Sequence, residues 1–165
     1  MTLPLGPGGS PLPGVPGIRV AEATTEQVPQ IVALLADDVL GRDRESSAVA
    51  AYDEAFAVID ADPSEHLLVL LDESDTVVGT AQLGFVRSLS RGGALRAQIE
   101  AVRVGATLRG RGVGRAFFGF MIEAARGEGA VLVQLTSDLQ RADAIRFYAS
   151  LGFLHSHAGL KLPLS

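Results

Sequence analysis

Residues 104–116 read VGATLRGRGVGRA, and this stretch lies between an apolar run and a pattern typical of a helix. Its centre interleaves glycine with arginine and one valine: Arg109, Gly110, Arg111, Gly112, Val113, Gly114 and Arg115. Glycine inside a helix or strand lowers stability, so three glycines at alternate positions indicate that the backbone approaches another molecule closely. The stretch is predicted to be a strand-to-helix turn that binds a ligand.

Composition limits the classes of function. The chain has 165 residues, 47% of them hydrophobic and 20% charged, which predicts a soluble globular protein with a real core. Its net charge is −5, whereas a protein that binds nucleic acid usually presents a basic surface, so no nucleic-acid partner is expected. There is no cysteine, and the three histidines do not have the spacing of metal ligands, so no metal is expected either.

The chain is also expected to be a cytoplasmic protein that does not insert into a membrane. No stretch reaches the roughly 18–20 consecutive apolar residues of a transmembrane helix. The N-terminus has neither a basic start nor an unbroken apolar segment, so it does not resemble a signal peptide.

Two regions are predicted along the chain. Residues 1–17 contain five prolines and five glycines and are expected to form a flexible or polyproline-like tail outside the fold. Residues 18–165 are expected to form a single domain. Its predicted strands are 18–21, 66–71, 76–86, 95–104 and 130–136, followed by one or two closing strands near the C-terminus. Helices are predicted over 24–40, 47–61, 113–126 and 138–152. This order predicts a mixed sheet with helices on both faces.

The glycine-rich turn is suited to phosphate. The backbone N–H groups at a helix N-terminus, the helix dipole and neighbouring guanidinium groups all attract anions. A Walker A loop would need a lysine and a hydroxyl residue here, and a dinucleotide-binding turn would need glycine where Arg115 stands. The alternative is a turn that merely allows a helix and a strand to pack closely, but that does not account for three glycines with three arginines.

Two blocks resemble the GNAT superfamily of N-acetyltransferases. The sequence RGRGVG at 109–114 is similar to that family's acetyl-CoA signature, (Q/R)-x-x-G-x-(G/A). AIRFYASLGF at 144–153 resembles a later helix of the family, with its Tyr followed by a Leu-Gly-Phe ending. The resemblance implies an α/β (mixed α+β) fold with a mostly antiparallel sheet of about six or seven strands. Within it, strands 95–104 and 130–136 splay apart beside the glycine-rich turn.

The resemblance also implies a site for acetyl-CoA as co-substrate. The pantetheine arm is expected to pair with the backbone of Val102 and Val104, and the pyrophosphate with the N–H groups of residues 111–115. The expected cofactor-binding residues are Val102, Arg103, Val104, Arg109, Gly110, Arg111, Gly112, Val113, Gly114, Arg115 and Arg141. Arg141 departs from the family's N-x-x-A arrangement, which reads R-A-D-A here, and it either contacts the cofactor or faces solvent.

Two side chains are candidates for proton transfer. Glu100 lies among apolar residues on the strand before the turn, where a carboxylate with a raised pKa could accept the amine proton through water. Its alternative role is to hold Arg103 or Arg96. Tyr148 matches the family tyrosine that gives a proton to the departing thiolate, although a lone tyrosine on a helix is usually a core residue. A main-chain N–H near Val102 is expected to meet the oxyanion.

The acceptor is less clearly indicated. Acidic residues at 37, 38, 43 and 45 would attract a cationic amine, whereas Arg87, Arg91 and Arg96 would favour an acceptor that carries an anionic group. The leading hypothesis is transfer of an acetyl group to a primary amine of a small molecule. The alternatives are a protein or peptide N-acetyltransferase and a non-catalytic acyl-CoA-binding sensor. A homodimer is one arrangement open to a domain of this size.

Overall fold

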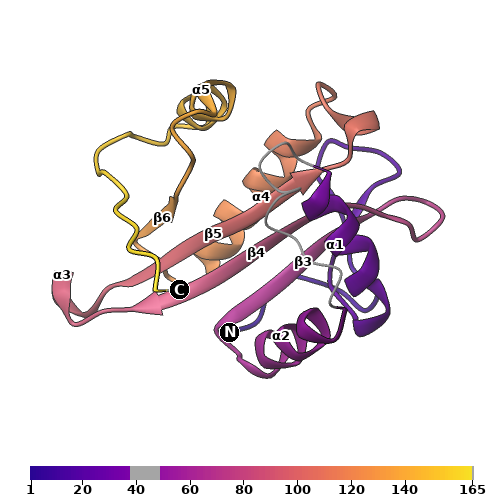
Figure 1. Ribbon diagram of the computed structural model, residues 1–165, viewed down its shortest axis with the longest axis horizontal. Coiled ribbons are helices and arrows are strands. Elements are labelled where there is room, and N and C mark those ends of the chain that lie inside the picture. Colours follow the sequence, from indigo (N-terminus) through magenta and orange to yellow (C-terminus); the bar gives the residue numbers. More distant parts are fainter. Residues whose placement is uncertain (38–48, 165) are drawn as a thin grey trace.

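The computed structural model describes residues 1–37 and 49–164, and it contains one mixed sheet of six strands (Figure 1). The strands lie in chain order, and every neighbouring pair is antiparallel except β5 and β6, which are parallel. They are β1 (Ser10–Pro11), β2 (Arg19–Glu22), β3 (Glu65–Leu71), β4 (Val77–Arg87), β5 (Leu95–Val104) and β6 (Leu132–Leu135). The predicted mixed, mostly antiparallel sheet is confirmed.

Helices cover both faces of the sheet, as predicted. They are η1 (Thr25–Gln27), α1 (Val28–Ala36), α2 (Val49–Ala61), α3 (Ser90–Gly93), η2 (Ala106–Leu108), α4 (Val113–Gly127) and α5 (Ala142–Ser150). Because side chains alternate along a strand, β3 sends Leu68 and Leu70 into the core under α4, and Val69 and Leu71 into the core under α1 and α2. The sheet therefore separates two hydrophobic cores, and α5 joins the one that contains α4.

The structure of residues 1–17 differs from the prediction. Residues 1–17 were expected to form a flexible tail, but Ser10 and Pro11 pair with β2, and Leu3 and Leu12 are 5% and 2% exposed in the α4-side core. One glycine of this segment, Gly9, allows close packing. A Cβ at Gly9 would lie 2.6 Å from the carbonyl oxygen of Val20, so only glycine fits against β2 at this point.

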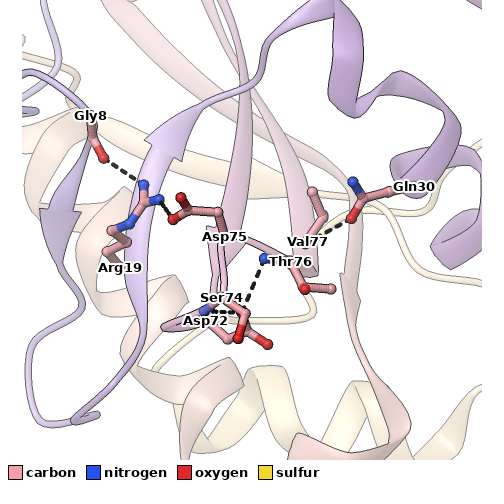
Figure 2. A network of polar contacts seen from close by, with 8 residues as sticks. All are labelled: Gly8, Arg19, Gln30, Asp72, Ser74, Asp75, Thr76 and Val77. Carbon is pink, nitrogen blue, oxygen red and sulfur yellow. Dashed lines mark hydrogen bonds and ion pairs between the residues drawn. The ribbon is translucent and has the colours of Figure 1, made fainter.

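A network of polar contacts fastens this segment to the sheet (Figure 2). Arg19 on β2 donates to the carbonyl oxygen of Gly8 and forms an ion pair with Asp75 in the β3–β4 turn. Nearby, the N–H of Val77 donates to Oε1 of Gln30 on α1 at 3.0 Å. The β3–β4 turn is thus held from both sides, by the N-terminal segment and by α1.

The C-terminal prediction is wrong within the described residues. One or two closing strands were expected, but the part described, up to residue 164, contains no strand after α5. Leucines 154, 160, 162 and 164 are between 83% and 95% exposed. Pro163 carries no N–H group for a ladder, which weakens any strand pairing there.

The buried N-terminal leucine gives a stability test. Leu12→Ala should lower the free energy of unfolding by about 2–4 kcal/mol, because it removes a fully packed side chain. Leu89→Ala is the matched control, since Leu89 is 99% exposed and should change the free energy of unfolding by less than about 0.5 kcal/mol. Urea unfolding followed by circular dichroism measures both. Equal midpoints for the two variants would show that the N-terminal segment does not pack in solution.

Candidate functional site

The sheet opens between β5 and β6. The two strands pair only from Arg96 opposite Leu132 to Ile99 opposite Leu135. Beyond that point β5 continues to Val104, while the chain after β6 departs toward α5 (Figure 1). Within the described residues, this leaves the β6-facing edge of residues 100–104 without a strand partner. The expected splay between these two strands is therefore present.

A β-bulge lies at the point where the strands separate. Gln82 is opposite Glu100 and Thr80 is opposite Arg103, so three steps along β5 match two steps along β4. Ala101 takes a φ of 53°, a left-handed conformation that is uncommon for a residue with a Cβ. Bulges redirect side chains and are frequent beside active sites. Here the bulge interrupts the alternation of side chains between the two faces of the sheet. Ile99 and Val102, three residues apart, therefore both contact the core on the α4 side.

The glycine-rich turn follows directly. Gly110 and Gly112 have φ values of 75° and 80°, so the turn requires glycine at these two positions. Gly112 is the N-cap of α4, and the N–H of Ala116 donates to its carbonyl oxygen at 3.0 Å. The N–H groups of residues 113–115 precede that bond and therefore point out of the N-terminus of the helix. Together with the helix dipole, they make an anion-binding position.

The three arginines of the turn have different environments. Nε of Arg109 donates to the carbonyl oxygen of Val104 at 3.3 Å, and its guanidinium lies 3.9 Å from Asp37. Arg115 donates to the carbonyl oxygen and hydroxyl of Ser150, so its side chain joins α4 to α5. Arg111 lines a cavity. A strand-to-helix turn lies where one was predicted, but the N–H of Arg111, one of those expected to bind pyrophosphate, donates to the carbonyl oxygen of Leu108 at 3.4 Å. The three guanidinium groups are directed to separate places.

That cavity has a volume of about 450 Å³ and opens beside the turn. Leu108, Arg111 and Val113 line it on one side, and residues 14–18 and 72–74 line it on the other. The carboxylate of Asp72 also accepts hydrogen bonds from the N–H groups of Ser74 and Thr76 in the β3–β4 turn (Figure 2). Sequence reasoning missed the contribution of residues 14–18, because it excluded the N-terminal segment from the fold.

Tyr148 lies in a group of aromatic rings. Its ring centroid is 5.5 Å from that of Phe118 on α4 and 6.1 Å from that of Phe153. Burial raises the pKa of Tyr148 above its ordinary value of 10.0, while the positive charges of Arg141 and Arg103 act in the opposite direction. The structure thus brings three of the predicted site residues together around one phenol.

Glu100 stands apart from this group. It is exposed, although apolar enclosure was expected from its neighbours in the sequence. It lies on the opposite face of β5 from Ile99, directly across from Gln82 on β4. The side chain is therefore accessible from the α1 and α2 side of the sheet, next to the bulge.

Two further observations concern other kinds of site. Among residues 1–37 and 49–164, no three His, Asp or Glu side chains are arranged to hold a metal ion. In the same part of the chain, no helix combines the length and apolar character needed to span a bilayer.

The open parallel strand pair and the glycine-rich helix N-terminus are features that the resemblance to acetyltransferases predicted, and comparisons with known proteins agree with that class. Residues 30–153 match the acetyltransferase (GNAT) family. An aminoalkylphosphonate N-acetyltransferase from Salmonella typhimurium is 28% identical over 143 residues, which cover 87% of this chain and 89% of the relative. The chain belongs to the GNAT family.

Solved structures share the fold. A Bacillus halodurans protein described as a transcriptional regulator is 41% identical, with a TM-score of 0.85 over 89% of this chain and 99% of the other. A predicted acetyltransferase from Clostridium acetobutylicum, solved with acetyl-CoA, has a TM-score of 0.70 at 14% identity over 89% of this chain and 96% of its own. The latter likeness shows the fold alone.

The environment of Tyr148 predicts its titration. One of the two tyrosines should ionise above pH 10.0, and Tyr148→Phe should remove that step while Tyr52→Phe keeps it. The folded state favours the neutral phenol, so this stabilisation is present below the ordinary pKa and is lost as pH rises through the raised one. Absorbance of tyrosinate against pH measures it. Loss of the late step in Tyr52→Phe, with its retention in Tyr148→Phe, would contradict the assignment.

Proposed function

We propose that this protein transfers the acetyl group of acetyl-CoA to a primary amine of a small molecule. The observation that supports this most is the unpaired edge of β5, which is followed along the chain by the glycine-rich turn and the N-terminus of α4. An extended pantetheine arm could pair with the backbone of Val102 and Val104 in place of the Arg103 and Arg109 side chains, which donate to these two carbonyl oxygens. The pyrophosphate would then reach the N–H groups of the glycine-rich turn without bending back.

The proposed cofactor site draws on main chain more than on side chains. The N–H groups of Val113, Gly114 and Arg115 would hold the pyrophosphate, and the positive φ of Gly110 and Gly112 would shape the turn around it. Arg111, which lines the cavity, supplies a positive side chain next to this position. Arg103 and Arg141, near Tyr148, would contact the pantetheine or the thioester end.

The proposed chemistry is direct attack in a ternary complex. The amine nitrogen attacks the thioester carbonyl after Glu100 takes its proton through water. A main-chain N–H next to the bulge, near Val102, would stabilise the oxyanion. The C–S bond then breaks, and Tyr148 gives its proton to the thiolate of CoA. The nitrogen loses its second proton as the amide forms, and that proton restores the Tyr148 phenol through solvent. A tyrosine of ordinary pKa is protonated at neutral pH, and burial, which raises the pKa of Tyr148, preserves that state, which this role requires.

The acceptor is proposed to be a small amine because the Salmonella typhimurium relative is an aminoalkylphosphonate N-acetyltransferase. Of the acidic residues considered for the acceptor, Asp37 contacts Arg109, and positions 38, 43 and 45 lie outside the described residues. The name of the Bacillus halodurans neighbour raises a regulatory role as a second reading. The net charge of −5 argues against direct nucleic-acid binding by this chain.

The proposed pyrophosphate position at the main-chain N–H groups of the turn can be tested by acetyl-CoA binding. Acetyl-CoA should raise the melting temperature of the protein, and Gly112→Glu should abolish the shift, because it places a negative charge at the phosphate position and a side chain at a φ of 80°. Gly119→Glu is the matched control, since Gly119 is on α4 with open space around it. Thermal unfolding with and without acetyl-CoA measures both. Equal shifts in the two variants would place the cofactor elsewhere.

Turnover separates a transferase from a sensor. Release of free thiol from acetyl-CoA should occur with at least one of 2-aminoethylphosphonate, tyramine, glucosamine, spermidine and a lysine-containing peptide. Tyr148→Phe and Glu100→Gln should each lower kcat about 10²-fold or more, with little change in acetyl-CoA binding. Turnover of the peptide alone would favour a protein acetyltransferase. Tight acetyl-CoA binding with no thiol release would favour a sensor.

A further inference from the structure

The α1 and α2 face of the sheet changes character along the strands. Leu67, Val69 and Leu71 on β3 contact the helices on this face. Toward the β4–β5 hairpin the same face becomes polar. A continuous set of amide and carboxylate side chains lies there, on four neighbouring strands: Glu65, Gln82, Gln98, Glu100 and Gln134. We call this set the polar row.

Hydrogen bonds order the polar row. Nε2 of Gln82 donates to Oε2 of Glu65 at 2.8 Å, and Nε2 of Gln134 donates to Oε1 of Gln98 at 2.7 Å. Gln82 is opposite Glu100, so it stands between the two carboxylates of the row. Glu65 is half-buried and held in place, whereas Glu100 is exposed.

Gly84 makes room for the Glu65 carboxylate. Gly84 is opposite Glu65 on β4, and a Cβ at Gly84 would lie 2.6 Å from Oε1 and 2.8 Å from Oε2 of Glu65. The carboxylate therefore lies over the backbone of β4, pointing across the sheet toward β5. The backbone at Gly84 does not need glycine for its φ, because it is not among the residues of positive φ. The glycine here provides space for a side chain.

We infer that Glu65 binds the ammonium group of the incoming acceptor before Glu100 takes its proton. This inference rests on the proposed function. At neutral pH an alkylamine arrives protonated, so a fixed carboxylate near the base would hold it. Neighbouring strands are about 4.8 Å apart, so a side chain that leans from β3 over β4 covers about half of the separation to β5. The nearest cation along β5 on this face is Arg96, and within residues 1–37 and 49–164 no ion pair joins it to Glu65.

Glu65→Gln tests the charge and keeps the shape. The glutamine oxygen still accepts from Gln82, so the strands remain joined while the negative charge is lost. We expect the KM of the accepted amine to rise about tenfold or more. kcat and the KM of acetyl-CoA should stay within about twofold, because the proposed role ends before the chemical step. Glu123→Gln on α4, which removes a charge from an exposed ion pair, is the matched control.

Gly84→Ala tests the position of the same carboxylate. The atoms that a Cβ would meet are the far end of a flexible side chain, so the carboxylate should move aside with little loss of stability. The KM of the amine should rise as in Glu65→Gln, and the double variant should be no worse than the single ones, since both act on one group. Gly119→Ala, with open space around it, controls for an added methyl group.

The assay is thiol release with 2-aminoethylphosphonate, tyramine and spermidine over a range of concentrations, alongside melting temperatures of every variant. An unchanged amine KM in Glu65→Gln overturns the assignment of Glu65 and leaves the transferase proposal standing. A rise in the KM of acetyl-CoA equal to that of the amine also overturns it, because the change would then be structural. No turnover of any amine by the native chain overturns both proposals.

Discussion

The extra residue in β5 at Ala101 determines the geometry of the whole site. Without it, β5 would keep its register against β4, and the side chains of residues 102 and 104 would point to the opposite face. With it, Val102 and Val104 join the core under α4, while Glu100 stays on the other face. The conformation of Ala101 is unfavourable by roughly 1–3 kcal/mol, so the surrounding structure must hold it there. The long pairing of β4 with β5 on the other edge provides that support.

The open edge of β5 and the aromatic group around Tyr148 depend on each other through α4 and α5. Phe118 on α4 contacts Phe147 and Tyr148 on α5, and Arg115 fixes the end of α5 by its bonds to Ser150. Because the chain leaves β6 to reach α5, this packing keeps the strands apart after Ile99. The aromatic contacts that bury Tyr148 therefore also keep the edge of β5 open. The raised pKa of the phenol and the open edge have one structural origin.

Local patterns were enough to predict much of the fold. Glycines and apolar periodicity in short windows predict the turn at 104–116, the hairpin of β3 and β4, and the helices α4 and α5. The bulge is not predicted in this way, since nothing in the run from Leu95 to Val104 marks Ala101 as different from its neighbours. The prediction of a flexible tail over residues 1–17 was wrong for the opposite reason. Its prolines and glycines are typical of a linker. Its leucines become core residues only because they pack against the sheet and α4.

The same distinction applies to the site. A sequence window shows Glu100 among apolar residues, which suggests a buried carboxylate, but the face on which a strand residue lies depends on what covers that face. Here α1 and α2 cover only part of the sheet, and the uncovered part carries the polar row. Tyr148 was predicted from the block 144–153, which resembles the family and also contains Phe153 in its ending. Arg103, Arg141 and Tyr148 were assigned to one site only through the family resemblance, and the structure adds that the charges of both arginines act on the phenol.

The division of the sheet into two faces also bears on the conflicting charges of the acceptor side. Acids and arginines are mixed along the sequence, so their numbers alone favour neither a cationic nor an anionic acceptor. In the structure, Arg87 and Arg91 lie at the β4–β5 hairpin, Glu100 lies beside the bulge, and Glu65 on β3 is opposite Gly84, between the bulge and the hairpin. An amine that approaches over the α1 and α2 face would meet the Glu65 carboxylate before it reaches the bulge, where the proposed thioester would stand. Any anionic group on the same molecule would extend toward the hairpin, so one acceptor could satisfy both sets of charges.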